Sequence, residues 1–183
     1  MKKSFMAGLL LLAVLSSCSK EDEVMPTVVV ASAVDNQVLV SIHDTEGNNL
    51  AGDTVFLSRL QIDARNDKRA VHGSVKEIDG VKFISFGASL PREDRVEWNA
   101  DRTQGRCQEP VVMSYGSHRI VLGNNLLYSE CPEMKGMLGG SSLIVESVAA
   151  GDTLIRRDAE KQRIVVPLIL DNAGFHIERN NPA

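Results

Sequence analysis

Apolar and polar residues alternate along most of this chain. Between residues 37 and 43, for example, Val38, Val40 and Ile42 occupy every second position. A period of two residues predicts a β-strand, because successive side chains of a strand point to opposite faces of a sheet. The same alternation, or a short apolar or β-branched run, predicts further strands at residues 54–60, 81–88, 111–115, 119–122, 142–148, 152–155, 164–170 and 175–177.

Residues that favour tight turns separate these segments. The clearest hairpin centres on Asp79 and Gly80, because both residues suit a type I′ turn. Residues 90–102 differ from the rest: Ser89 as a cap followed by Pro91 predicts a short helix or a loop. Other turns are predicted at residues 46–49, 123–125, 139–140, 151–152 and 172–174, where Gly and Asn cluster.

Many short strands with close turns and little helix predict an all-β fold. We expect an antiparallel β-sandwich, immunoglobulin-like or transthyretin-like, with at most one short helix. Residues 38–55 resemble the opening hairpin of the transthyretin-like and carboxypeptidase-regulatory-like sandwiches, with Asp44, Gly47 and Gly52 between two strands. The chain has Asn49 where those families often have Pro. The resemblance implies the sandwich and transfers no active residue, since such domains are usually accessory modules.

The first 17 residues have the form of a secretory signal. Lys2 and Lys3 precede an apolar run at residues 5–15, and small residues follow it. A membrane-spanning helix needs about 20 apolar residues, so this run is too short to be one. The segment Leu15-Ser16-Ser17-Cys18 resembles the lipobox of bacterial lipoproteins.

The lipobox resemblance implies cleavage before Cys18 and lipid on that residue, as diacylglyceryl and an N-acyl chain such as palmitate. Two or more acyl chains hold a protein on a membrane stably, whereas one does so only marginally. We therefore expect a signal peptide at residues 1–17, a lipidated flexible tether at 18–27 and a single sandwich domain at 28–183.

The residues directly after Cys18 carry a cluster of charge. Lys20, Glu21, Asp22 and Glu23 resemble the tag of surface-exported lipoproteins in Bacteroidota. The resemblance implies an outer-membrane lipoprotein that faces the cell exterior. The alternatives are a plain polar tether, since such a composition does not fold by itself, and a position facing the periplasm.

Net charge and cysteine content bear on the class of partner and on disulfide bonding. Loss of Lys2 and Lys3 with the signal changes the formal net charge from −4 to −6, and a negative chain without basic clusters argues against a nucleic-acid partner. In a secreted chain, Cys107 and Cys131 are first interpreted as a disulfide. A pair of buried free thiols or a metal site are the alternatives, and neither cysteine has a second ligand at a zinc spacing.

No catalytic, phosphate-binding or cofactor-binding motif occurs, so we expect neither an enzyme nor a cofactor. Ser114 and Ser117 lie close in sequence to His118, but no orienting carboxylate identifies itself. The segment 44–48 places oxygen ligands at alternate positions as a calcium loop does, yet Asn49 and Val55 stand where that loop needs Gly and Glu. An ordinary turn around Asp44 is the better interpretation, and we predict no metal site.

Two groups of side chains could bind a partner. The aromatic residues Trp98, Tyr115 and Tyr128 would serve a glycan only if they were exposed together. The other group is an apolar cluster that forms either a binding surface or part of the core: Leu126, Leu127, Met134, Met137 and Leu138.

Together these observations predict a lipid-anchored, non-catalytic binding or scaffolding module at the cell envelope. Its partners would be the membrane, through Cys18, and an extracellular protein or glycan. The alternatives are a glycan-binding accessory lipoprotein of a surface uptake system, a structural or adhesin subunit, and a hydrolase with an unrecognised site.

Overall fold

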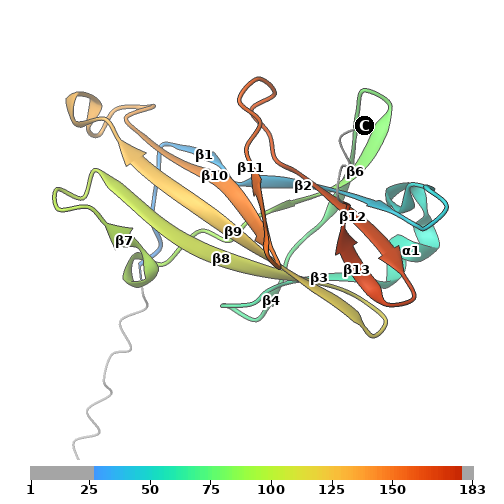
Figure 1. Ribbon diagram of the computed structural model, residues 1–183. Helices are drawn as coiled ribbons and strands as arrows, with labels where there is room; N and C mark the ends of the chain where they lie inside the picture. Colours follow the sequence, from blue (N-terminus) through green and yellow to red (C-terminus); the bar gives the residue numbers. More distant parts are fainter. Residues whose placement is uncertain (1–26, 179–183) are drawn as a thin grey trace, which may run out of the picture.

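The computed structural model describes residues 27–178, which form two β-sheets (Figure 1). The predicted signal peptide, Cys18 and the charged tag lie outside the described residues. The strands of the larger sheet are β1 (Ala33–Asp35), β3 (Leu60–Ala64), β4 (Arg69–Ala70), β7 (Glu97–Trp98), β8 (Gln104–Tyr115), β9 (His118–Glu130), β10 (Ser141–Ala150) and β11 (Thr153–Arg156). Those of the smaller sheet are β2 (Gln37–His43), β5 (Ser74–Ile78), β6 (Val81–Gly87), β12 (Val165–Asp171) and β13 (Gly174–Ile177).

The long strands β8, β9 and β10 form the centre of the larger sheet, whose order is β1-β10-β9-β8-β3-β4. The short strands β11 and β7 pair with β10 and β8. The smaller sheet has the order β13-β12-β2-β6-β5. One short α-helix, α1 (Thr54–Arg59), and the single-turn 3₁₀ helices η1 (Leu50–Gly52), η2 (Glu93–Arg95) and η3 (Pro132–Met134) complete the described part. None of its helices is long and apolar enough to cross a membrane.

The two sheets share one core, which confirms the predicted all-β sandwich. Alternate residues of the central strands turn inward, so the apolar period of two puts one face of each sheet into the core. The smaller sheet contributes side chains such as Ile42, Phe86 and Leu168, and the larger contributes Met113 and Leu122, each at most 2% exposed. The hairpin at Asp79 and Gly80 is also confirmed: these residues join β5 to β6 with φ angles of 54° and 77°.

The strand predicted at residues 54–60 is wrong, because residues 54–59 form helix α1 and β3 begins at Leu60. The carboxylate of Asp53 accepts hydrogen bonds from the backbone N–H groups of Val55 and Phe56 at 2.8 and 3.2 Å, which caps the helix. Phe56 then enters the core. The second strand of the transthyretin-like hairpin is therefore absent at its expected position.

Three further expectations need correction. The sandwich is not purely antiparallel, since β1 pairs with β10 and β12 pairs with β2 in parallel. The turn predicted at residues 123–125 lies inside β9, where Asn124 is fully buried. The segment 90–102 contains a short helix, η2, as predicted, but also the strand β7, which the prediction lacked.

Candidate functional site

A groove crosses the outer face of the larger sheet. The strand register places four polar side chains in one row on its floor: Gln108 of β8, Asn125 of β9, Ser147 of β10 and Arg156 of β11. The residue next to Asn125 on β9, Leu126, belongs to the core. Because adjacent residues of a strand face opposite sides, the row faces away from the smaller sheet.

Hydrogen bonds connect three members of this row. Gln108 Nε2 donates to Asn125 Oδ1 at 3.0 Å, and Asn125 Nδ2 donates to Ser147 Oγ at 2.9 Å. Adjacent strands lie about 4.8 Å apart, so the row from β8 to β11 is about 14 Å long. The groove therefore offers oriented amide and hydroxyl groups at regular spacing on a rigid sheet.

Charged side chains flank the polar row, and the groove encloses about 410 Å³. Arg106 faces Glu146 with 3.6 Å between Nε and Oε2. The exposed Arg156 forms no ion pair with any residue from 27 to 178. Its guanidinium can therefore bind an anionic group in the groove.

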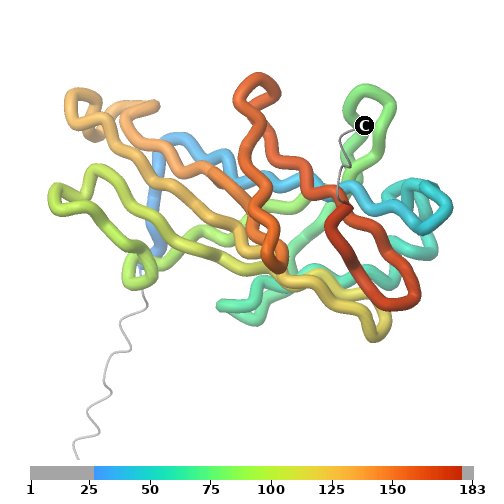
Figure 2. Tube along the Cα trace, viewed as in Figure 1, coloured from blue at the N-terminus to red at the C-terminus, as the bar shows by residue number. Residues whose placement is uncertain are grey.

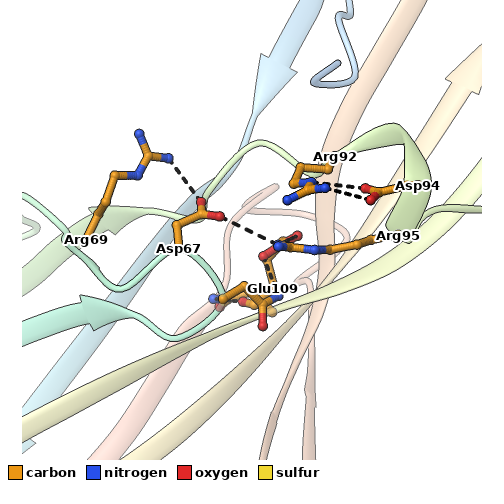
Figure 3. Close-up of polar contacts among 8 residues, drawn as sticks. Asp67, Arg69, Arg92, Asp94, Arg95 and Glu109 are labelled. Atoms are coloured by element: carbon orange, nitrogen blue, oxygen red, sulfur yellow. Dashed lines mark hydrogen bonds and ion pairs between the residues drawn. The ribbon is translucent and has the colours of Figure 1, made fainter. Parts of the chain in front are cut away.

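Arg95, which also lines the groove, contacts a buried polar cluster (Figure 3). Its Nη1 atom lies 3.5 Å from Oε1 of Glu109 and 3.6 Å from Oδ1 of Asp67. Asn66 Nδ2 donates to Oε2 of Glu109 at 2.8 Å. Asp67 in turn pairs with Arg69 at 3.0 Å. The cluster thereby fixes the position of Arg95 beside the groove.

The pairing of β8 explains why a polar cluster lies here. β8 pairs with β7 at Gly105 and Arg106 and with β3 from Val111 to Tyr115. Residues 107–109 lie between these two partners, so part of this edge of β8 has no neighbouring strand among residues 27–178. The end of β3 brings Asn66 and Asp67 to this gap, and η2 brings Arg95.

Glu109 is the most unusual residue of the cluster, because its side chain points inward from β8 and is only 3% exposed. Asn124, opposite it on β9, donates from Nδ2 to the backbone oxygen of Glu109 at 2.8 Å. Within residues 27–178, Oε1 of Glu109 and Oδ1 of Asn124 have no hydrogen-bond partner. Burial raises the pKa of Glu109 above its ordinary value, and the hydrogen bond from Asn66 and the charge of Arg95 only partly oppose this.

The predicted disulfide between Cys107 and Cys131 is absent, and both thiols are free. Cys107 lies opposite Leu126 on β9, and Cys131 follows the end of that strand, five residues further along. Five residues of strand extend about 16 Å, whereas disulfide-bonded Cα atoms lie about 4.4–6.8 Å apart. Burial raises the pKa of the half-buried Cys107 thiol to about 12.

The structure separates Ser114 from His118 and places Asp44 in a turn. Ser114 lies opposite Arg119 and His118 lies opposite Tyr115, so Ser114 and His118 occupy opposite faces of the β8–β9 hairpin. Asp44 Oδ1 accepts hydrogen bonds from the N–H groups of residues 46 and 48 at 2.9 and 2.8 Å, as expected for an ordinary turn. Among residues 27–178, no three His, Cys, Asp or Glu side chains come together as metal ligands.

The three aromatic candidates Trp98, Tyr115 and Tyr128 belong to two separate pairs. Trp98 and Tyr128 meet edge to face with 5.2 Å between ring centroids, and the guanidinium of Arg102 lies 4.8 Å from the Trp98 ring. Tyr115 instead packs at 4.7 Å against Phe56. Because Arg102 lies over the Trp98 ring, this pair does not present an open stacking platform of the kind that sugars use.

Sequence reasoning missed the groove, because its floor depends on the pairing of four strands. One signal for the buried cluster was present, however. Glu109 is two residues before Val111 and four before Met113, so strand alternation places it on their inward face.

Comparisons of the chain with models of protein families, with curated proteins and with solved structures found no match.

Proposed function

We propose that this protein is a non-catalytic binding module at the cell envelope, held on the outer membrane by lipid on Cys18 and facing the cell exterior. Its ligand would be a hydroxyl-rich molecule that carries a carboxylate, as acidic glycans do, and would bind in the groove. The observation that supports this most directly is the row of Gln108, Asn125 and Ser147, which ends at Arg156.

The chemistry of the row favours this ligand class. Amide and hydroxyl side chains both donate and accept hydrogen bonds, which suits the hydroxyl groups of a saccharide. A guanidinium binds a carboxylate through two parallel hydrogen bonds, and Arg156 forms no ion pair with residues 27–178. The proposal needs no aromatic stacking, in keeping with the position of Arg102 over Trp98.

The ligand proposal predicts that tri-galacturonic acid binds the purified protein and that the neutral trisaccharide maltotriose binds at least about 10-fold more weakly. Changing Arg156 to Met should weaken binding of the acid about 10- to 100-fold, because a hydrogen bond to a charged group contributes about 1.5–3 kcal/mol. Isothermal titration calorimetry at low and high salt measures both effects, and screening should weaken binding of the acid at high salt.

Arg119→Met is the matched control, because Arg119 is also an exposed arginine of the larger sheet but does not line the groove. It should leave the affinity unchanged. Equal losses for Arg156→Met and Arg119→Met would indicate nonspecific attraction between charges, and the absence of any difference between the two trisaccharides would refute the carboxylate part of the proposal.

The anchor is tested independently on intact cells. We expect external protease to remove the wild-type protein, and Cys18→Ala to release the protein from the membrane fraction. Replacement of Lys20-Glu21-Asp22-Glu23 with alanines should leave the protein membrane-bound but protected from protease. Wild-type protein that is protected on intact cells and degraded after lysis would instead place the module in the periplasm.

A further inference from the structure

The loop that joins β9 to β10, residues 131–140, carries a sulfur-containing side chain at every third position from its start. Cys131, Met134 and Met137 follow one another at this spacing, and Gly140 occupies the next such position. Figure 2 shows the loop curled on itself at the tip of the β9–β10 hairpin. The groove and its ligand make no use of these three sulfur atoms.

The backbone of the loop repeats one hydrogen bond at the same spacing. The N–H groups of Met134, Met137 and Gly140 donate to the carbonyl oxygens of Cys131, Met134 and Met137 at 3.0, 2.9 and 3.0 Å. Each bond closes a four-residue turn, whose end Cα atoms lie within about 7 Å of each other. Consecutive sulfur-bearing residues are therefore held close together by the backbone.

A further hydrogen bond turns this series of turns into a ring. The N–H of Cys131 donates to the carbonyl oxygen of Gly140 at 2.8 Å, so the last turn returns to the first. Gly136 and Gly139 have φ angles of 78° and 84°, which other residues rarely adopt. A Cβ atom at Gly140 would clash with the carbonyl group of Met134. The ring is thus a tightly specified structure with the three sulfur-bearing residues at its corners.

All three side chains face water to an unusual degree for apolar groups. Cys131 is exposed, and Met134 and Met137 are 40% and 62% exposed. Thiolate and thioether sulfur atoms are soft ligands that select Cu(I) over harder ions such as Mg²⁺ or Ca²⁺. We propose that the ring formed by residues 131–140 binds one Cu(I) ion through the sulfur atoms of Cys131, Met134 and Met137.

A carboxylate beside Cys131 can accept the proton that such binding releases. The Cys131 thiol donates a hydrogen bond to Oε2 of Glu133 at 3.0 Å. When Cu(I) binds, the S–H bond breaks, a Cu–S bond forms and the proton leaves through Glu133 to solvent; the oxidation state of copper does not change. Affinity should therefore fall as pH falls, because protons compete with Cu(I) for the thiolate.

The experiment uses the purified full-length chain with Cys18→Ser, so that Cys107 and Cys131 are the only thiols. Cu(I) is supplied without oxygen and competes between the protein and the chromogenic chelator bicinchoninate. We expect one Cu(I) per chain, and X-ray absorption at the copper edge should show sulfur ligands only. Cys131→Ser, Met134→Leu and Met137→Leu should each weaken binding at least about 10-fold.

The Met→Leu variants separate metal binding from apolar docking, because leucine keeps the apolar volume and removes the sulfur. Cys107→Ser is the matched control for the thiol and should leave the Cu(I) affinity unchanged. All variants of the loop should keep the thermal midpoint of the metal-free protein, since the loop lies outside the core. Failure to bind one Cu(I), unchanged affinity in both Met→Leu variants, or loss of binding in Cys107→Ser would each overturn the proposal.

Discussion

Leu168→Ala is expected to lower the free energy of unfolding by about 2–5 kcal/mol, because it removes a fully buried side chain and leaves a cavity. The substitution lies on β12 in the smaller sheet, whereas Trp98, the only tryptophan, lies on β7 in the larger sheet. If the two sheets form one cooperative domain, Trp98 fluorescence should report this loss. The measurement is urea unfolding followed by fluorescence and by circular dichroism in parallel.

Leu154→Ala provides the comparison within the larger sheet. Leu154 is 48% exposed on β11, so Leu154→Ala should change the free energy of unfolding by only about 0.5 kcal/mol, well below the loss expected for Leu168→Ala. A Trp98 transition that stays at the wild-type urea concentration in Leu168→Ala, while the circular dichroism transition moves, would show that the sheets unfold separately.

Arg95→Ala is expected to lower the free energy of unfolding by about 2 kcal/mol at pH 7. Removal of one partner from a buried ion pair typically costs about 3–5 kcal/mol, and we expect less here because the Arg95 side chain is 30% exposed. In a Glu109→Gln background the same substitution should cost much less, since no buried carboxylate then loses its cation. A double-mutant cycle by chemical unfolding measures this coupling.

The same cluster predicts a pH dependence of stability. The pKa of Glu109 is raised in the folded protein above its ordinary value of 4.5, mainly by burial. Between pH 4.5 and the raised pKa, the folded state holds a proton that the unfolded state has released, so the contribution of Glu109 to stability is lost as pH rises. Glu109→Gln should remove this decline, and Arg95→Ala should extend it to higher pH, because loss of the cation raises the pKa of Glu109 further.

Arg69→Ala tests whether these effects belong to the buried pair. Arg69 also contacts Asp67, at 3.0 Å, but its side chain is 73% exposed, so its removal should cost only about 0–1 kcal/mol. Two outcomes would contradict the assigned role of Glu109. One is an effect of Arg69→Ala as large as that of Arg95→Ala, and the other is an Arg95→Ala effect that persists in full in the Glu109→Gln background.

The sequence predicts best those strands whose apolar residues recur with a period of two. In β12 the buried residues Val166 and Leu168 alternate with less buried ones, which is the direct consequence of placing one face in the core. In β2 the apolar residues Val38, Val40 and Ile42 also alternate and enter the core.

The sequence does not predict helix α1, because its apolar residues follow one another without a helical period. Val55, Phe56 and Leu57 form a short apolar run that is typical of a strand, and only the cap at Asp53 distinguishes the two structures.

The groove could not be derived from the sequence, because its floor depends on which strands pair and in which register. A register shift between Val145 and Ser147 on β10 is needed to bring Ser147 opposite Asn125. Nothing in the local sequence of β10 marks this irregularity. Strand register also explains the free thiols. The pairing of β8 with β9 places Cys107 opposite Leu126, five residues before Cys131, so the two thiols lie far apart along the hairpin.

The parallel pairing of β12 with β2 has a consequence for how the protein would fold after the proposed export. β2 ends at His43, and its partner begins at Val165, so the smaller sheet stays incomplete until more than 120 further residues, including β12, have emerged. Such distant pairing slows folding, because a long loop must close before the contact forms. During this delay one edge of β2 remains open to other strands, and a periplasmic chaperone that covers it would protect the chain from aggregation.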